Sequence, residues 1–509
     1  MKARGRFLLA FGAAVASGVL TTVSVEHRTA SGLGWVAFVP VLVPLLLFKE
    51  QVAPAILAGG VFGAVRGGFL FGWLITDGRW AEWAWVMLSH VLAGLLWSWL
   101  VWRFGQLPAP ELQPTPARKA GRQRPLAPIL PGAGGGADAW QRSIGHLRLA
   151  MFVSASWTVV EWGQGVVLPA WNPVGLAVAA NLPLLQLVQS TGPAGLSTML
   201  VFANVIVLTS IRRLVREPGR ISWAGRFDVT ATLAVIFLGA LTGFYSLTHR
   251  VPPDPLQQVM CAAAKGGAAG SLTALSAAAG PTATDLIVWR EVKFTPADYQ
   301  KLAELGIGKT GALVSGVLGD NGRGLVGART VLPGLVTNLY APLNNAPFFV
   351  PFGAPPNRNL SPFRQRGVNW VTFLNWQAGS PPVLRAALPS QAQGWIVLFD
   401  PPGHSRRAGR QLRENLRVWA VAYGRALIFS GRGAGSLLQA PTGRLVAQTG
   451  EQSRESVAGQ VPVASAQTET LYARLGDWWP VATGILTLVF ALGERLKRSR
   501  AASPRRLRP

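Results

Sequence analysis

Asp285-Leu-Ile-Val-Trp-Arg-Glu291 is the stretch from which the rest of the chain is interpreted. It is a short apolar run that delivers a carboxylate to its end, as a buried strand does when it leads into an active site. The stretch lies in a polar region, residues 250–470, with hydrophobic segments on both sides. This arrangement predicts an α/β domain inserted between membrane spans.

The composition indicates a membrane protein. Half of the 509 residues are hydrophobic and only 14% are charged, which is unusual for a soluble protein. The net charge of +26 is concentrated at the ends of apolar segments, as at Lys2 to Arg6 and Arg495 to Arg508. Charge placed there sets membrane topology, and it does not form the single basic face that nucleic acid requires. We therefore expect no nucleic-acid partner.

Eight apolar segments predict eight crossings, because each is about the length that spans a bilayer core of roughly 30 Å, the second being short. They lie at 1–25, 34–48, 54–76, 83–104, 147–165, 192–211, 227–247 and 478–494. With the basic N-terminus in the cytoplasm, the other basic loops also fall inside, and residues 250–470 fall outside.

The predicted organisation has three parts. Residues 1–249 form a transmembrane domain of seven helices with a flexible cytoplasmic linker at 105–146, which is rich in Pro, Gly and Arg. Residues 250–470 form the extracytoplasmic domain, and residues 471–509 contain the last helix and a basic tail. The prolines between Val166 and Ser190 predict an interfacial or re-entrant segment in place of a continuous helix.

Strand and helix patterns alternate in the extracytoplasmic region, which favours a layered α/β domain. Helical patterns lie at 297–305 and 408–423. Strand patterns lie at 256–264, 285–289, 311–318, 368–374, 394–399, 426–430 and 436–440.

A series of motifs runs through nearly the whole chain in a fixed order. The membrane half has Trp157-Thr-Val-Val-Glu161-Trp162, then Trp171-Asn-Pro-Val-Gly175, then Gly192-Pro-Ala-Gly-Leu-Ser197. The polar region has the Glu291 strand, Val350-Pro-Phe-Gly353, and the pairs Gly424-Arg425 and Gly443-Arg444. In this order the chain resembles the apolipoprotein N-acyltransferase family of multi-pass membrane enzymes.

The resemblance implies a nitrilase-like αββα sandwich outside the bacterial cytoplasmic membrane, and it implies no cofactor. In the family, a cysteine thiolate takes an acyl group from phospholipid, and the acyl group then passes to the amino terminus of a lipoprotein. A glutamate moves the protons and a lysine stabilises the oxyanion. Glu291 matches the glutamate, and Glu161, Trp171, Phe352 and Gly353 match substrate-binding segments.

The chain departs from the family at the two other catalytic positions. Counting back from Val350-Pro-Phe-Gly353, the lysine falls on Ala346, and counting back from Pro381, the cysteine falls on or beside Asn375. Neither side chain can perform the corresponding step.

Three other residues are candidate substitutes for the missing groups. Cys261, the one cysteine, excludes a CxxC metal site and lies in an apolar run that favours a buried structural role. Lys293 is close to Glu291 in sequence, and His404 lies between Asp400 and Ser405 in a turn-like segment. We expect solvent exposure for the lysine and a turn for the histidine. Glu161 within an apolar span requires a polar partner or a role in binding.

Three hypotheses follow. The first is a catalytically impaired member of the lipoprotein maturation pathway that binds phospholipid, lipoproteins or lipidated peptides. The second is a working N-acyltransferase or amide hydrolase with a rearranged site. The third is a structural protein of the cell envelope.

Overall fold

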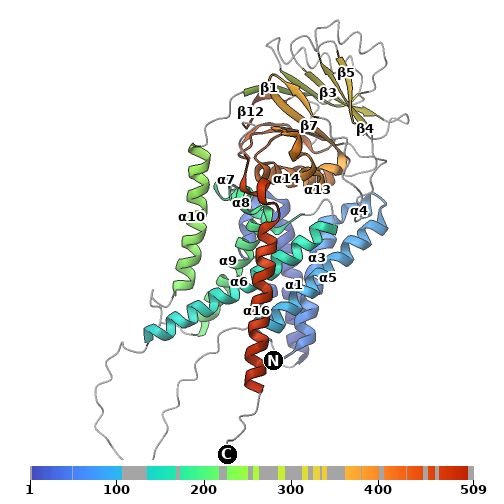
Figure 1. Cartoon of the computed structure of the whole chain (residues 1–509). Helices are drawn as coiled ribbons and strands as arrows, with labels where there is room; N and C mark the ends of the chain where they lie inside the picture. The colour runs from blue at the N-terminus through green and yellow to red at the C-terminus, as the bar shows by residue number, and fades with distance from the viewer. Residues whose placement is uncertain are drawn as a thin grey trace, which may run out of the picture.

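The computed structural model describes residues 3–48, 50–105, 135–167, 172–216, 226–249, 256–262, 285–292, 312–318, 325–332, 335–340, 362–379, 381–399, 406–431, 433–450, 457–464 and 469–502. Figure 1 shows a bundle of helices with a β-sandwich above it, and with both chain ends below.

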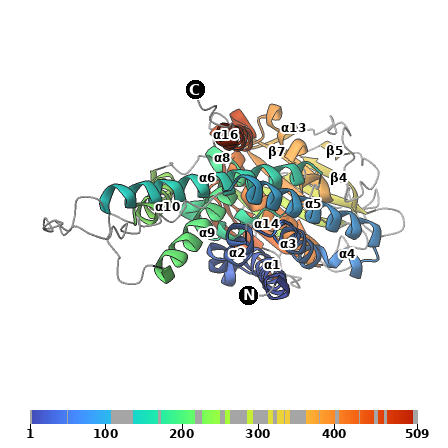
Figure 2. The same cartoon turned by 90° about the horizontal axis from the view of Figure 1, so that it is seen from below.

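The helices of the bundle come from the first half of the chain and from its end. They are α1 (Ala3–Glu26), η1 (Arg28–Trp35), α2 (Val39–Leu47), α3 (Val52–Phe71), α4 (Trp73–Thr76), α5 (Trp80–Phe104), α6 (Gly135–Val167), η2 (Val174–Val178), α7 (Leu182–Leu185), α8 (Val188–Thr191), α9 (Pro193–Arg216), α10 (Phe227–His249), α15 (Leu471–Leu475) and α16 (Trp478–Ala502). Viewed from below, α10 lies at one edge, beside α6 and α9 (Figure 2).

Seven helical segments of the described chain are long and apolar enough to cross a membrane, against the eight predicted. The fifth predicted span, 147–165, is helical but is not among the seven. It belongs to α6, which is packed between α9, α16 and α5 and carries buried polar side chains. A helix enclosed by other helices does not need a fully apolar surface. The prediction of a linker to residue 146 was also too long, because α6 begins at Gly135.

The segment after α6 confirms the effect of its prolines. In place of one helix, residues 174–191 form three short pieces, η2, α7 and α8. Asn181 caps α7 by accepting a hydrogen bond from the backbone N–H of Leu184. These pieces lie directly below the sandwich (Figure 1).

Two six-stranded sheets form the sandwich. Their orders are β12-β1-β2-β3-β4-β5 and β11-β10-β9-β8-β7-β6, and β1 to β3 and β7 to β9 are the parallel strands. The strands are β1 (Leu256–Ala262), β2 (Leu286–Val292), β3 (Ala312–Leu318), β4 (Leu325–Leu332), β5 (Leu335–Tyr340), β6 (Phe363–Gln365), β7 (Val368–Leu374), β8 (Gly394–Phe399), β9 (Ala426–Gly431), β10 (Gly435–Gln439), β11 (Leu445–Gln448) and β12 (Val457–Pro462). Between them lie η4 (Asn375–Gly379), α13 (Pro381–Ala386), η5 (Leu388–Ser390) and α14 (Arg406–Tyr423).

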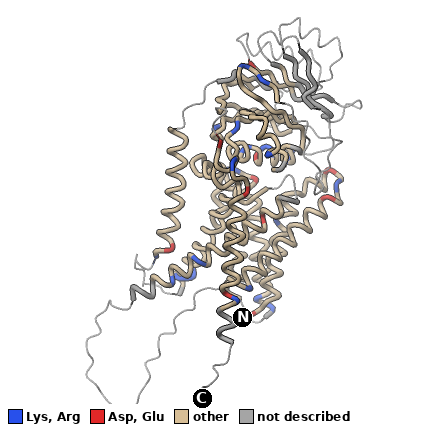
Figure 3. Tube along the Cα trace, viewed as in Figure 1, with Lys and Arg blue, Asp and Glu red and all other residues tan. Residues whose placement is uncertain are grey.

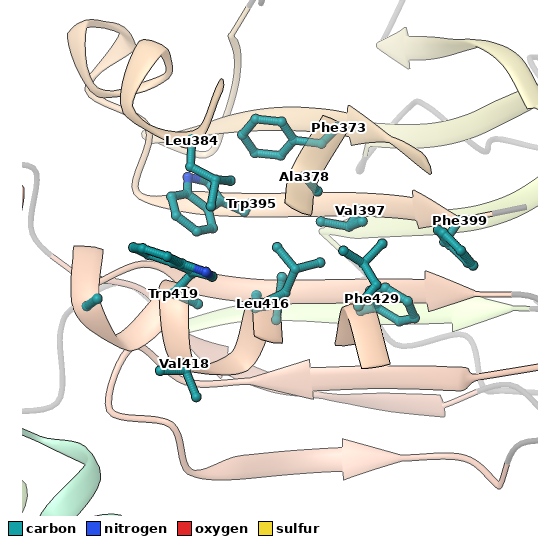
Figure 4. Close-up of a cluster of buried hydrophobic side chains, with 14 of the residues drawn as sticks. Phe373, Ala378, Leu384, Trp395, Val397, Phe399, Leu416, Val418, Trp419 and Phe429 are labelled. Carbon is teal, nitrogen blue, oxygen red and sulfur yellow. The ribbon is translucent and has the colours of Figure 1, made fainter. Parts of the chain in front are cut away.

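Strand β8 shows how the layers are built. Its side chains alternate between the two faces of the sheet. Ile396 and Leu398 pack into the core between the sheets, whereas Trp395, Val397 and Phe399 pack into a second core formed with α14 (Figure 4). All five are almost completely buried, as expected for a parallel strand covered on both faces. The predicted fold class, a helical membrane part with an α/β sandwich, is confirmed.

The core under α14 does not end at the sandwich. The same cluster of buried side chains contains Leu416 and Trp419 of α14 and also Leu70, Trp73 and Leu185 of the helical bundle. One continuous apolar core therefore joins the two parts.

Glycines let α3 and α5 cross closely. A Cβ atom on Gly94 would lie 2.1 Å from the carbonyl oxygen of Gly59, and a Cβ atom on Gly63 would lie 2.1 Å from that of His90. Small residues at such crossings allow helix backbones to approach in a membrane.

We predict that Gly94→Ala lowers the free energy of unfolding by about 1–3 kcal/mol, because the added methyl group forces α3 and α5 apart. Gly12→Ala in α1 is the matched control, since no atom lies within 4 Å of the new Cβ. The control should be neutral or stabilising by about 0.5–1 kcal/mol, the usual preference of a helix for Ala. Thermal unfolding in detergent measures both, and equal effects would contradict the close crossing.

Candidate functional site

The position matched to the family nucleophile lies at a strand end. Asn375 follows β7 directly, begins η4 and has a φ angle of 50°. This left-handed conformation is uncommon outside glycine, and Asn tolerates it better than most residues. Glu291 is the next-to-last residue of β2, also at the carboxyl end of a parallel strand, and its side chain is outside the described residues. Carboxyl ends of parallel strands are a common place for active sites.

The turn that begins at Asn375 is held against the helical bundle. The next residue, Trp376, stacks on Trp73 of α4 with ring centroids 5.7 Å apart and planes 8° apart. The edge of Trp376 also meets Phe399 at 5.1 Å. Such aromatic pairs are worth about 0.5–1.5 kcal/mol beyond their burial. The strand end and its turn therefore sit on the membrane part itself.

Polar contacts from α14 strengthen this junction. Arg407 donates two hydrogen bonds, both 2.7 Å long, to the two carboxylate oxygens of Glu26 at the end of α1. Gln411 donates to Glu26 at 2.9 Å and to the carbonyl of Leu70 at 2.7 Å, and accepts from the Trp73 indole at 3.1 Å. Bidentate arginine–carboxylate pairs are both strong and geometrically specific.

Glu161 has a partner that sequence reasoning missed. Its carboxylate lies 3.7 Å from the Arg66 guanidinium, and both side chains are at most 2% exposed. Glu161 also accepts a hydrogen bond from the backbone N–H of Val174 at 2.8 Å, and Arg66 donates to the carbonyl of Asn172. The Asn172 amide in turn accepts from Asn415 of α14. The signal for this pair was present, since Arg66 is the one charged residue in the span predicted at 54–76 and a buried arginine needs a partner.

A second polar cluster ties the sandwich to α15 and α16. Asp477 accepts hydrogen bonds from Arg385 at 3.0 Å and from the Tyr472 hydroxyl at 2.6 Å. Burial, together with the nearby Tyr423 and Asp477, raises the pKa of Tyr472 far above its usual range. Burial also raises the pKa of Tyr423. Both phenols therefore stay neutral at physiological pH.

This cluster borders a cavity of about 220 Å³ between the bundle and the sandwich. Trp162, Thr191, Pro381 and Trp419 are among the residues that line it.

The remaining predicted positions can be placed only in part. Cys261 is in β1, and its side chain is outside the described residues. Trp171, Lys293, Ala346, Phe352, Gly353 and His404 are all outside the described residues. Of the predicted site residues, the structure thus fixes the surroundings of Glu161 and the backbone of Glu291 and Asn375. Within the described chain, no three His, Cys, Asp or Glu side chains are placed to hold a metal ion.

Comparison with known proteins identifies the membrane half. The sequence model of the apolipoprotein N-acyltransferase N-terminal domain matches residues 17–206, which contain Arg66, Glu161 and Asn172. This part of the chain is therefore similar to the N-terminal domain of apolipoprotein N-acyltransferases.

One curated relative in this family is the apolipoprotein N-acyltransferase of Geobacter metallireducens. It is 27% identical over 209 residues, which are 40% of this chain and 34% of the relative. The chain therefore matches about a third of the length of that relative.

Solved structures similar to the chain include an amidase from Nesterenkonia sp., at 19% identity and a TM-score of 0.32, over 44% of this chain and 96% of the amidase. A mutant of the Nesterenkonia AN1 amidase from the nitrilase superfamily aligns at 18% identity, with a TM-score of 0.32, over 44% of this chain and 95% of the amidase.

The buried pair makes a testable prediction. We expect Glu161→Gln or Arg66→Met alone to lower the free energy of unfolding by about 3–5 kcal/mol, because each leaves a charge buried without its partner. The double variant should regain much of this loss. Thermal unfolding in lipid nanodiscs measures all three, and losses that simply add in the double variant would contradict the pairing.

Proposed function

We propose that the chain is a member of the apolipoprotein N-acyltransferase family that binds phospholipid and lipidated peptides or lipoproteins at the bacterial cytoplasmic membrane and has lost the acyl-enzyme chemistry. The nitrilase-like sandwich then serves as a binding module on the outer face of that membrane. Similarity to the family supports the pathway, and Asn375 and Ala346, at the positions matched to the cysteine and the lysine, support the loss of chemistry.

The observation that carries this proposal is Asn375. By resemblance, the family nucleophile falls on or beside this residue, which begins the turn after β7. A carboxamide is not a nucleophile toward an ester and cannot form a thioester. Ala346, at the position matched to the lysine, has no ammonium group to stabilise an oxyanion. Glu291 is the one catalytic residue type retained, and a base without a nucleophile performs no acyl transfer.

The contacts around the turn that begins at Asn375 support a retained role in ligand binding. Trp376 is buried against Trp73, and α14 is bonded to Glu26. These contacts keep the strand end at the membrane part, where a membrane-bound ligand arrives. If the family pocket is present, Ala346 and Asn375 make it less charged, which favours binding over proton transfer.

The basic residues support the orientation. Figure 3 shows Lys and Arg at the lower ends of the helices as well as in the sandwich. Arg4 and Arg6 lie at the start of α1, and Arg495 lies in the last part of α16. Basic residues next to membrane spans favour the cytoplasmic side, which leaves the sandwich outside.

The direct test places the purified protein in phospholipid nanodiscs with a diacylated lipopeptide. Binding is read by fluorescence anisotropy and acyl transfer by mass spectrometry. We expect binding without transfer, and unchanged binding in Glu291→Gln. In a Cys261→Ser background, the double variant Ala346→Lys, Asn375→Cys should gain one acyl chain, because it restores the thiol and the amine.

Two results would contradict the proposal. Acyl transfer by the unchanged protein that disappears in Glu291→Gln means a working enzyme with a relocated nucleophile, and Cys261→Ser tests whether that nucleophile is the single thiol. If no lipopeptide binds, the remaining hypothesis is a structural protein of the cell envelope.

A further inference from the structure

A second cavity is lined mainly by residues of α9 and α10. These parts of the two helices lie at the end of the bundle away from the sandwich (Figure 1). The volume of the cavity is about 340 Å³, and its walls are mostly apolar. The wall from α9 includes Ala203, Ile206 and Val207, and the wall from α10 includes Val229 and Ile236. We call it the α9–α10 groove. It is separate from the candidate site described above.

Contacts at both ends hold α10 against the bundle, and Ile236 also packs against the bundle core. Near the sandwich, Gly243 lies against α7, where a Cβ atom would come within 1.8 Å of the Pro183 carbonyl oxygen. At the other end, Asp228 bonds to His146 at 2.8 Å. Between these points α10 has large exposed apolar side chains, such as Phe237 at 65% exposure. An apolar face of this kind within a membrane span contacts hydrocarbon.

The charges at the mouth of the groove favour an anion. Arg213 of α9 and Arg226, the residue before α10, both line it. Among the described residues of the lining, Asp228 is the one acidic residue, and its carboxylate is bonded to His146 and to the backbone N–H of Val229. The hydroxyl of Ser210, also in the lining, is buried with no hydrogen-bond partner in the described part of the chain. Two cations and a hydroxyl donor are the groups that bind a phosphate.

We propose that the α9–α10 groove binds one anionic phospholipid from the membrane leaflet farther from the sandwich. One acyl chain fills the apolar part, and the phosphate contacts Arg213, Arg226 and Ser210. Apolar walls alone would accept any lipid, whereas the paired arginines select for a net negative headgroup, since basic residues at the membrane surface attract anionic lipids. The bound lipid fills the space between α10 and α9 and thus fixes the helix that leads into the sandwich.

The test uses the full-length protein in nanodiscs of equal parts phosphatidylglycerol and phosphatidylcholine. After transfer to detergent, native mass spectrometry reads the lipid retained. We expect one phosphatidylglycerol per chain in preference to phosphatidylcholine, and at least a tenfold lower retained fraction in Arg213→Gln, Arg226→Gln. The matched control is Arg4→Gln, Arg6→Gln, which removes the same charge at the same end of the bundle but outside the groove lining. It should retain the lipid.

A second variant tests the apolar wall of the groove separately from the two arginines. Val207→Trp narrows the apolar wall and keeps both arginines, and it should also lose the lipid while its unfolding temperature stays within a few degrees of the unchanged protein. Equal loss in the control pair, or equal retention of phosphatidylcholine, would overturn the proposal. A dimer that disappears in Val207→Trp would also overturn it, because a second copy of the chain would then be the occupant.

Discussion

The structure depends on α14, which contacts the helical bundle on one side and a sheet of the sandwich on the other. Residues four apart lie on the same face of a helix. Arg407, Gln411 and Asn415 therefore face the bundle together and bond to Glu26, Leu70 and Asn172. Leu412, Leu416 and Trp419 are buried in the core against the sheet that contains β7 and β8. One helix thus forms hydrogen bonds with polar groups at the ends of α1 and α3, and it covers the apolar face of that sheet.

This arrangement explains how the sandwich is held at a membrane. A sheet face as apolar as that of β8 must be covered, and a charged side chain buried in a membrane span must be paired. The chain meets both needs at one junction, because the Arg66–Glu161 pair reaches α14 through Asn172 and Asn415. The turn that begins at Asn375 then lies over the bundle through the Trp73–Trp376 stack. Under the proposed function, loss of the nucleophile and of the lysine would leave this support in place.

Features that depend on local pattern could be predicted from the sequence. The strand patterns at 368–374 and 394–399 coincide with β7 and β8, because a strand buried on both faces is a short continuous apolar run. The broken segment after α6 followed from its prolines. By contrast, β4 and β5 were missed, since Gly327 and Arg329 interrupt the apolar pattern of β4 and Asn338 interrupts that of β5.

Features that depend on tertiary contacts could not be predicted in the same way. Glu161 was recognised as needing a partner, but the choice of Arg66 rests on the packing of α3 against the segment after α6. The polar face of α14 has the sequence of an ordinary solvated helix surface, and only the fold shows that it meets Glu26. Likewise, no sequence signal distinguishes Asn375 in the left-handed conformation from an asparagine in any other turn.

The central claim, that α14 joins the membrane part and the sandwich into one body, is tested most directly by a double-mutant cycle on Glu26 and Arg407. The unfolding free energies of Glu26→Gln, Arg407→Gln and the double variant would be measured in nanodiscs. The account predicts a coupling energy of about 1–3 kcal/mol, because the two side chains form a bidentate pair across the junction. Single effects that add within error would mean that the sandwich is held to the bundle by other contacts.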